Sequence, residues 1–207
     1  MPAGKRGVLC VFTKTPLAGR VKTRLVPVLG VEGAAELYRQ LLSRTLQTAR
    51  ASVIDCVRLY CTPTTDHPLL QDYAQGFDIE LRLQAGADLG AKMAAALAEG
   101  LAEFDYALVL GCDIPALRPA DLDLACEYLA SGTDVVLGPA TDGGYYLLGV
   151  LAPQPGLFRN MAWGSPGVLV ETRRRLSAAA LHWRELPEYP DIDVPGDLPD
   201  LEKLFTG

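Results

Sequence analysis

The sequence predicts an α/β fold in which a mostly parallel, mixed sheet is covered by helices on both faces. Short apolar runs alternate with longer amphipathic stretches along the chain, and this alternation is typical of parallel sheets. The runs 7–12 and 106–110 are apolar throughout, as expected for strands that are buried on both faces. A length of 207 residues favours one domain over residues 1–207, because chains usually divide at greater length.

In the first half, strands and helices are expected in alternation. Residues 53–61 and 78–83 alternate apolar and polar side chains, which predicts strands. Apolar residues recur at helical spacing over 31–50, and residues 89–104 are rich in alanine, so both stretches are expected to be helical. The predicted elements are, in order, strand 7–12, helix 31–50, strand 53–61, strand 78–83, helix 89–104 and strand 106–110.

The second half continues the alternation less regularly. Pro119 stands at a natural first helical position, so a helix is expected over 119–131. Residues 139–144 link the next two strands and are too few for a helical crossover, which predicts an antiparallel neighbour or a strand that reaches another edge. The remaining predicted elements are strands 134–138 and 145–150, loop 152–167, helix 168–180, strand 181–186 and helix 195–205.

Composition excludes several classes of protein. With a formal net charge of -6 and a pI near 4.9, the chain is too acidic for a typical nucleic-acid-binding domain. Five cysteines without a Cys-x-x-Cys pair predict neither a disulfide framework nor a zinc site. The first apolar run is too short for a signal peptide or a membrane span. We therefore expect a reduced, cytoplasmic protein that binds neither nucleic acid nor membrane.

Positive charge is concentrated in the segment TKTPLAGRVKTRL, residues 13–25, and no acidic residue occurs between Gly7 and Val31. Because the segment carries four cations, the rest of the chain carries about -10, so the patch is local and suits a small anion. Gly19 allows backbone amides to approach a ligand, and Lys22 and Arg24 can pair with phosphate oxygens. The spacing matches neither a P-loop nor Gly-x-Gly-x-x-Gly. The alternative is a solvated surface loop.

Two aspartates are candidates for holding a metal. Asp113 follows the apolar strand 106–110, and a carboxylate there can bind Mg²⁺, which prefers oxygen ligands and bridges phosphates. The alternative is that Asp113 caps the following helix. As a metal ligand, Asp113 is expected to be an unpaired carboxylate near other acids, so its neutralisation should change stability little or even stabilise the metal-free protein. Asp193 is the expected second ligand and Asp191 its rival, unless one of them caps the last helix.

Glycine-rich turns offer further candidate contacts. Asp142-Gly143-Gly144 is either a simple hairpin turn or a point where a sugar or phosphate approaches the backbone closely. The segment 84–93 ends a strand with Gly86 and opens a helix with Gly90, and it places Lys92 on the first turns of that helix. Only two histidines occur in the chain, and neither lies in a glycine-rich loop, so a histidine-based triad is not expected.

Five segments, PLAGRVKTRL, QAGADLGAKM, GCDIPAL, GPATDGGYYLLG and DIDVPGDL, occur in this order over nearly the whole chain. Together they resemble a bacterial family of GT-A-type transferases, described as glycosyltransferases or nucleotide-diphospho-sugar transferases. The first segment is also similar to that of phospholactate guanylyltransferases. The resemblance implies a single-domain GT-A fold, a nucleotide across the carboxyl ends of the strands, and Mg²⁺ or Mn²⁺ as cofactor. Asp113-Ile114-Pro115 replaces the Asp-x-Asp of many GT-A glycosyltransferases and is more typical of nucleotidyltransferase relatives.

Motifs and resemblance together assign the candidate site. Lys22 and Asp113 are expected to be catalytic, and Asp113 and Asp193 are expected to hold the metal. The expected nucleotide-binding residues are Thr13, Lys14, Pro16, Gly19, Lys22, Thr23, Arg24, Gly86 and Gly90. The expected contacts to the acceptor or sugar are Lys92, Asp142, Gly143 and Gly144.

The predicted function is that of a metal-dependent transferase with a nucleotide-activated donor. Family description favours glycosyl transfer from a nucleotide-diphospho-sugar to a small acceptor. Four cations in one loop and Asp113-Ile114-Pro115 favour the alternative. In that alternative, a guanylyltransferase-like enzyme joins a nucleoside monophosphate to a phosphorylated acceptor and releases pyrophosphate. A non-catalytic nucleotide-binding module is the alternative from another class.

Overall fold

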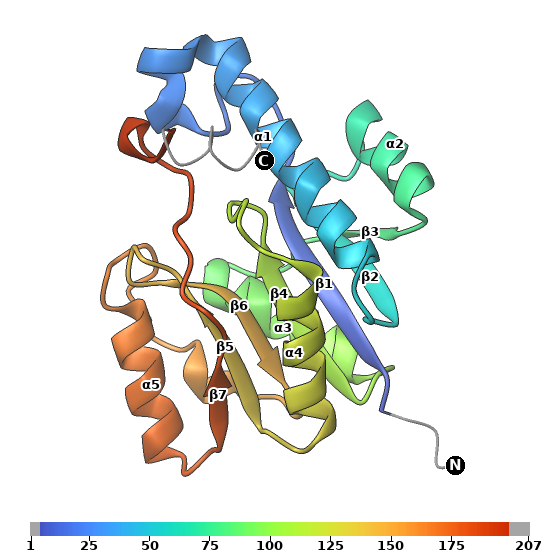
Figure 1. Cartoon of the computed structure of the whole chain (residues 1–207), viewed down its shortest axis with the longest axis vertical. Coiled ribbons are helices and arrows are strands. Elements are labelled where there is room, and N and C mark those ends of the chain that lie inside the picture. The colour runs from blue at the N-terminus through green and yellow to red at the C-terminus, as the bar shows by residue number, and fades with distance from the viewer. Residues whose placement is uncertain (1–4, 199–207) are drawn as a thin grey trace.

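The computed structural model describes residues 5–198, and within them the strands form one seven-stranded sheet (Figure 1). The strand order is β3-β2-β1-β4-β6-β5-β7, and only β6 runs antiparallel to its neighbours in this sheet. The strands are β1 (Gly7–Lys14), β2 (Cys56–Thr62), β3 (Glu80–Leu83), β4 (Tyr106–Gly111), β5 (Val135–Pro139), β6 (Tyr145–Val150) and β7 (Trp183–Glu185). The α/β class and the expected antiparallel neighbour are both confirmed.

Helices cover both faces of the sheet, as predicted. They are α1 (Val26–Arg50), α2 (Pro68–Phe77), α3 (Leu89–Leu101), α4 (Pro119–Ala130) and α5 (Val168–Ala178), with single turns of 3₁₀ helix at η1 (Thr23–Leu25), η2 (Pro155–Leu157) and η3 (Pro195–Asp197). Figure 1 shows α4 in front of the strands and α3 behind them. None of the helices in the described part of the chain combines the length and the apolar character that a membrane crossing requires.

Alternation along β1 shows how the two layers of the core form. Leu9 and Val11 are buried on the face that α1, α2 and α4 cover. Val8 and Cys10 are buried on the opposite face, beneath α3 and α5. Successive side chains of a strand point to opposite faces, so a strand in the middle of a doubly covered sheet must be apolar at every position. This is why the runs at β1 and β4 contain no polar residue before their ends.

The two continuously apolar runs are neighbouring central strands. β1 pairs in parallel with β4, from Gly7 opposite Tyr106 to Phe12 opposite Gly111. This confirms the prediction for 7–12 and 106–110. The prediction that residues 1–207 form one domain stays a prediction.

Element boundaries differ from expectation at a few places. α1 is interrupted at Gly30 (φ 71°, ψ 170°), so its regular part begins at residue 31, as predicted. No element was expected over 63–77, where α2 lies. The loop over 152–167 contains the short turn η2. Of the helix expected over 195–205, η3 is observed, and residues 199–205 lie outside the described residues.

Candidate functional site

The carboxyl ends of β1 and β4 define the place where a ligand can enter. These strands are neighbours, but β1 leads through α1 to β2 on one side, whereas β4 leads through α4 to β5 on the other. Such a switch in direction leaves a crevice beyond the strand ends. Several cavities in the described part of the chain lie there, and two of them share the lining residues Leu89, Gly111 and Asp113.

The larger cavity, of about 500 Å³, is called the cationic cavity because Lys14, Lys22 and Lys92 line it. Lys14 ends β1, and Lys92 lies in the first turn of α3. The Asp88 side chain caps α3 by accepting a hydrogen bond of 2.8 Å from the Ala91 amide. β1, the turn into η1 and α3 therefore each bring a lysine to this cavity, whose other charged lining residues are Asp88, Asp113 and Asp193. The cavity thus offers ammonium groups to an anion and carboxylates to a cation bound with it.

The smaller cavity, of about 280 Å³, is called the acidic cavity because Asp113, Asp142 and Asp191 line it. Asp142 lies in the turn between β5 and β6, where its carboxylate accepts a hydrogen bond of 2.8 Å from the Gly144 amide. Burial raises the pKa of the Asp191 carboxyl, and the negative charges of Asp142 and, to a smaller extent, Asp113 raise it further. Asp191 therefore lies close enough to the other two carboxylates to be affected by their charge.

Lys22 is the buried centre of the charged groups. Its backbone adopts a left-handed conformation (φ 46°, ψ 41°), which turns the chain into η1. Only 4% of its side chain is exposed, and its Nζ lies 2.6 Å from Asp113 Oδ1 and 3.9 Å from Asp193 Oδ1. The same ammonium donates a hydrogen bond of 2.5 Å to the Ile192 carbonyl. A buried ammonium is stable only when such partners surround it.

The segment 189–193 closes the site from the far end of the chain. The Ile192 amide donates to the Asp113 carbonyl at 3.1 Å, and the Ile192 side chain packs with Leu25 and Leu41. Figure 1 shows this segment running from β7 toward the start of α1. Lys22, Asp113 and Asp193 are therefore held together by three separate parts of the chain.

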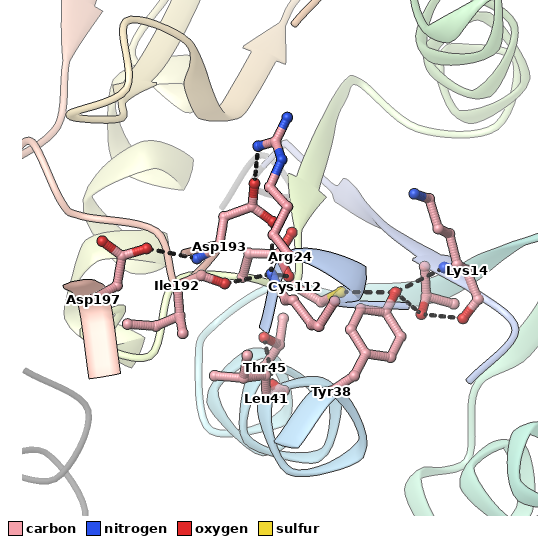
Figure 2. Close-up of polar contacts among 12 residues, drawn as sticks. Lys14, Arg24, Tyr38, Leu41, Thr45, Cys112, Ile192, Asp193 and Asp197 are labelled. Carbon is pink, nitrogen blue, oxygen red and sulfur yellow. Dashed lines mark hydrogen bonds and ion pairs between the residues drawn. The ribbon is translucent and has the colours of Figure 1, made fainter. Parts of the chain in front are cut away.

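Arg24, Asp193 and Asp197 form a chain of contacts at the edge of the site (Figure 2). Arg24 pairs with the Asp193 carboxylate, but 71% of its side chain is exposed and it does not line the cationic cavity. Asp197 accepts hydrogen bonds from the Asp193 and Val194 amides. Among the residues that the structure describes, the capping of the last turn falls to Asp197, which leaves the Asp193 carboxylate to the cavity.

Tyr38 connects the ends of the two central strands. Its hydroxyl accepts a hydrogen bond of 2.8 Å from the Lys14 amide and lies 2.9 Å from Thr13 Oγ1, and the Cys112 thiol donates to it at 3.3 Å (Figure 2). Because Thr13 Oγ1 donates to the Lys14 carbonyl, it accepts from Tyr38. Burial raises the pKa of Tyr38, and Cys112 and Asp113 add to this effect. The neutral hydroxyl therefore uses its full hydrogen-bonding capacity.

Tyr38→Phe is expected to lower the free energy of unfolding by about 1–3 kcal/mol, because the Lys14 amide loses its buried acceptor. The measurement is denaturant unfolding of both proteins. Tyr73→Phe is the matched control, since its hydroxyl donates to the Arg39 carbonyl and also contacts Ser43, away from both cavities. Equal losses in the two variants would contradict a special role for Tyr38.

The structure brings together part of the predicted site. Of the expected nucleotide-binding and metal residues, the cationic cavity is lined by Thr13, Lys14, Lys22, Asp113 and Asp193. Lys92, expected at the acceptor or sugar, lines this same cavity. Asp142 and Gly144 line the acidic cavity. The other predicted residues lie outside the walls of both cavities, and these are Pro16, Gly19, Thr23, Arg24, Gly86, Gly90 and Gly143.

Two of the glycines outside the walls are required for close packing. A Cβ at Gly90 would lie 2.6 Å from the Trp163 ring, and one at Gly143 would lie 2.2 Å from the Pro166 carbonyl oxygen. Gly143 also has φ 88°, which favours glycine. These glycines position the loop 152–167 against α3 and the β5–β6 turn. Through this loop they shape the acidic cavity, which Trp163 and Ser165 line.

Sequence reasoning missed two residues that support the cavities. Gln84 follows β3, and its side-chain amide donates to the Thr13 and Tyr60 carbonyls at 3.0 and 2.9 Å. Tyr38 was recognised only as one of the apolar positions of a helix. The sequence signal for Gln84 was a polar side chain directly after a strand. The signal for Tyr38 was a hydroxyl at a position that faces the core.

Asp113 and Asp193 suit a divalent cation whose remaining ligands are oxygen atoms of a bound substrate. One cation, the Lys22 ammonium, already lies within 4 Å of both Asp113 and Asp193. Among residues 5–198, no group of three or more His, Cys, Asp or Glu side chains is arranged to hold a metal. Mg²⁺ in proteins is commonly held by one or two carboxylates together with substrate phosphates and water. The residues therefore fit a metal completed by phosphate oxygens, and they do not fit one held by protein alone.

Comparison with known proteins gives a family match and several structural matches. A family model described as "Uncharacterized protein conserved in bacteria (DUF2064)" matches residues 45–165. A protein provisionally named as a nucleotide-diphospho-sugar transferase, from Desulfovibrio desulfuricans G20, is 31% identical, with a TM-score of 0.86 over 94% of this chain and 85% of that chain. No curated protein sequence matches this chain.

More distant structures share the fold. A nucleotidyl transferase from Methanothermobacter is 16% identical, with a TM-score of 0.64 over 98% of this chain and 99% of that chain. Glucosyl-3-phosphoglycerate synthase from Mycobacterium tuberculosis, solved with Mn²⁺ and uridine diphosphate, is 12% identical, with a TM-score of 0.56 over 98% of this chain and 76% of that chain. Nucleotidyl and glycosyl transferases are thus both represented among proteins with this fold.

Proposed function

Because this chain belongs to the DUF2064 family of bacterial proteins, we propose that it is a metal-dependent glycosyltransferase whose donor is a nucleotide-diphospho-sugar. One observation carries the proposal: Asp113 stands on the wall that the cationic cavity shares with the acidic cavity. The diphosphate of the donor lies in the cationic cavity, and the transferred sugar lies where the two cavities meet. The provisional name of the Desulfovibrio relative supports this assignment.

The protein groups act by positioning and by charge. Lys14, Lys22 and Lys92 attract the diphosphate, and Asp113 and Asp193 are the residues that would hold Mg²⁺ or Mn²⁺. The metal, when bound, supplies positive charge that stabilises the leaving diphosphate. In the reaction, the bond from the anomeric carbon to the diphosphate breaks and a bond to the acceptor oxygen forms. Asp142 or Asp191 accepts the acceptor's proton, and no protein nucleophile is needed.

Nucleotidyl transfer is the second candidate. Asp113-Ile114-Pro115 favours it, since the Asp-x-Asp pattern is absent there. The nucleotidyl transferase from Methanothermobacter, which shares the fold, agrees with it. In this reaction an acceptor phosphate attacks the α-phosphate of a nucleoside triphosphate, and pyrophosphate leaves.

A donor panel separates the candidates. The protein is incubated with each of several nucleotide-diphospho-sugars and nucleoside triphosphates, with Mg²⁺ or Mn²⁺ and a mixture of small acceptors. Release of nucleoside diphosphate from a sugar donor is the expected result. Release of pyrophosphate from a triphosphate would replace the proposal by the second candidate. Tight nucleotide binding without any release would favour the non-catalytic module.

Metal binding is expected to depend on the nucleotide. The protein alone should bind Mn²⁺ weakly, because the described residues provide two suitable carboxylates and the Lys22 ammonium lies against both. A nucleoside diphosphate adds phosphate oxygens, and its affinity should rise on the order of ten-fold or more when Mn²⁺ is present. Calorimetric titration with UDP and GDP, with Mn²⁺ and after chelation with EDTA, measures both effects. Equal nucleotide affinity in the two conditions would contradict metal dependence.

A further inference from the structure

The acidic cavity differs from the cationic cavity in its charge. Asp113, Asp142 and Asp191 line it, and none of its described lining residues is Lys, Arg or His. The cation nearest to Asp113, Lys22, contacts it from the side of the cationic cavity, and its Nζ is engaged by Asp113 Oδ1 and the Ile192 carbonyl. An anionic group in the acidic cavity would therefore meet carboxylates and neutral donors such as Tyr145 and Ser165, but no cationic side chain that compensates its charge.

The difference in charge between the two cavities would remain if a metal were bound at Asp113, as in the proposed function. Asp142 and Asp191 would still face the acidic cavity with their negative charges. Ionised carboxylates only accept hydrogen bonds, so they match a ligand that is rich in hydroxyl donors. A phosphate or carboxylate group provides acceptors and negative charge instead, and it matches neither requirement.

Aromatic side chains line the same cavity as the carboxylates, among them Trp163 and Tyr145. The Trp163 ring stacks on Phe158, with centroids 6.4 Å apart and planes at 28°. It also meets the Tyr145 ring edge-on at 6.4 Å. Gly90 of α3 lies directly against the indole, where a Cβ would not fit. The ring is thus held in place, and an aromatic wall with a few polar groups opposite is typical of a preformed small-molecule site.

We propose that the acidic cavity selects an uncharged, hydroxyl-bearing acceptor, a sugar or another polyol, and rejects phosphorylated and carboxylated acceptors. Its carboxylates receive the acceptor hydroxyls, while Trp163 contacts the apolar face of the ring. The cavity volume of about 280 Å³ suits a group as small as one sugar ring. The inference rests on the proposed function, in which this cavity receives the acceptor. It argues against transfer to a phosphorylated acceptor.

Tryptophan fluorescence can test this selectivity directly. The chain has two tryptophans, and Trp183→Phe leaves Trp163 as the single reporter, since Trp183 lies on β7 outside both cavities. The probes are matched pairs: glucose, mannose and galactose, each against its 6-phosphate. Titrations are run with and without UDP and Mg²⁺. We expect each bound neutral sugar to have an affinity at least about ten-fold higher than that of its phosphate ester.

Two variants test whether the preference for neutral sugars over phosphate esters arises in the acidic cavity. Asp142→Asn removes one lining charge and should reduce the discrimination against phosphate esters several-fold. Glu188→Gln is the control, because it removes an exposed acid that does not line the cavity, and it should leave the discrimination unchanged. Phosphate esters that bind as tightly as neutral sugars, or failure of every neutral sugar to bind, would overturn the inference.

The outcome for this inference is separate from the outcome for the proposed function. If UDP and GDP bind but the phosphate esters are preferred, the inference is wrong and the nucleotide site stands. If no nucleotide binds, the proposed function is wrong. The titrations without nucleotide then still decide whether the cavity prefers uncharged ligands.

Discussion

Asp113→Asn is expected to reduce turnover by at least about 10²–10³-fold, the range found when a group that stabilises transition-state charge is removed. Asp113 lines both cavities and pairs with Lys22, so in the proposed function its charge would serve the metal, the donor and the lysine together. Asparagine keeps the size and removes the charge. Turnover is measured as release of nucleoside diphosphate, and the metal dependence of nucleotide binding should disappear as well.

The same variant should also be less stable than the parent protein. From the sequence, Asp113 was treated as an unpaired carboxylate whose neutralisation changes stability little or even stabilises. The expectation that Asp113 is unpaired is wrong, because Asp113 Oδ1 is 2.6 Å from the buried Lys22 ammonium. Removing one partner of a buried charge is costly, although the Asp113 side chain is 41% exposed and water moderates the loss. Denaturant unfolding of the variant and the parent protein measures whether the free energy of unfolding falls, as expected.

Asp72→Asn is the matched control for Asp113→Asn. Asp72 is an exposed acid on α2, away from both cavities. The control should keep normal turnover and stability. Normal turnover by Asp113→Asn in the presence of Mg²⁺ would contradict the proposed mechanism.

Lys22→Met is expected to weaken nucleotide binding on the order of ten-fold or more, because a charge-assisted hydrogen bond to phosphate contributes about 1.5–3 kcal/mol. Methionine fills much of the buried volume of the lysine side chain, so the loss reports on charge. Nucleotide affinity is measured by calorimetric titration. Unchanged affinity for every nucleotide that the parent protein binds would contradict the role of Lys22.

Substitutions of two arginines in the same segment should weaken nucleotide binding less than Lys22→Met does. Arg24→Ala should weaken binding less than Lys22→Met, since Arg24 is 71% exposed and acts on the cavity only through Asp193. Arg20→Ala removes an exposed charge that lines neither cavity, and it should have almost no effect at moderate salt. Equal effects of all three substitutions would indicate general attraction by the loop and not a bound phosphate.

The sheet was largely predictable because its central strands carry a strong pattern. A strand covered on both faces has no position for a polar side chain, so β1 and β4 can be identified from composition alone. α2 was missed although Leu70, Tyr73 and Phe77 recur at helical spacing after Pro68. Its pattern is short, and a helix of ten residues offers few repeats.

The candidate site was predictable only in part. Residues at or just beyond the end of a strand, such as Lys14 and Asp113, are positioned by that strand, and both line the cationic cavity. Trp163 reaches the acidic cavity only because Gly90 and Gly143 admit the loop 152–167 closely. Such contacts depend on the assembled tertiary structure. They leave no periodic pattern in the sequence.

The contact between Lys22 and the Ile192 carbonyl joins residues 170 positions apart. A nascent chain on the ribosome has all strands of the sheet before it has this contact, since β7 ends at Glu185. The ammonium of Lys22 then lacks two of its partners, Ile192 and Asp193, until those residues have been synthesised. The order of translation therefore completes the charged centre around Lys22 only after the sheet that carries it.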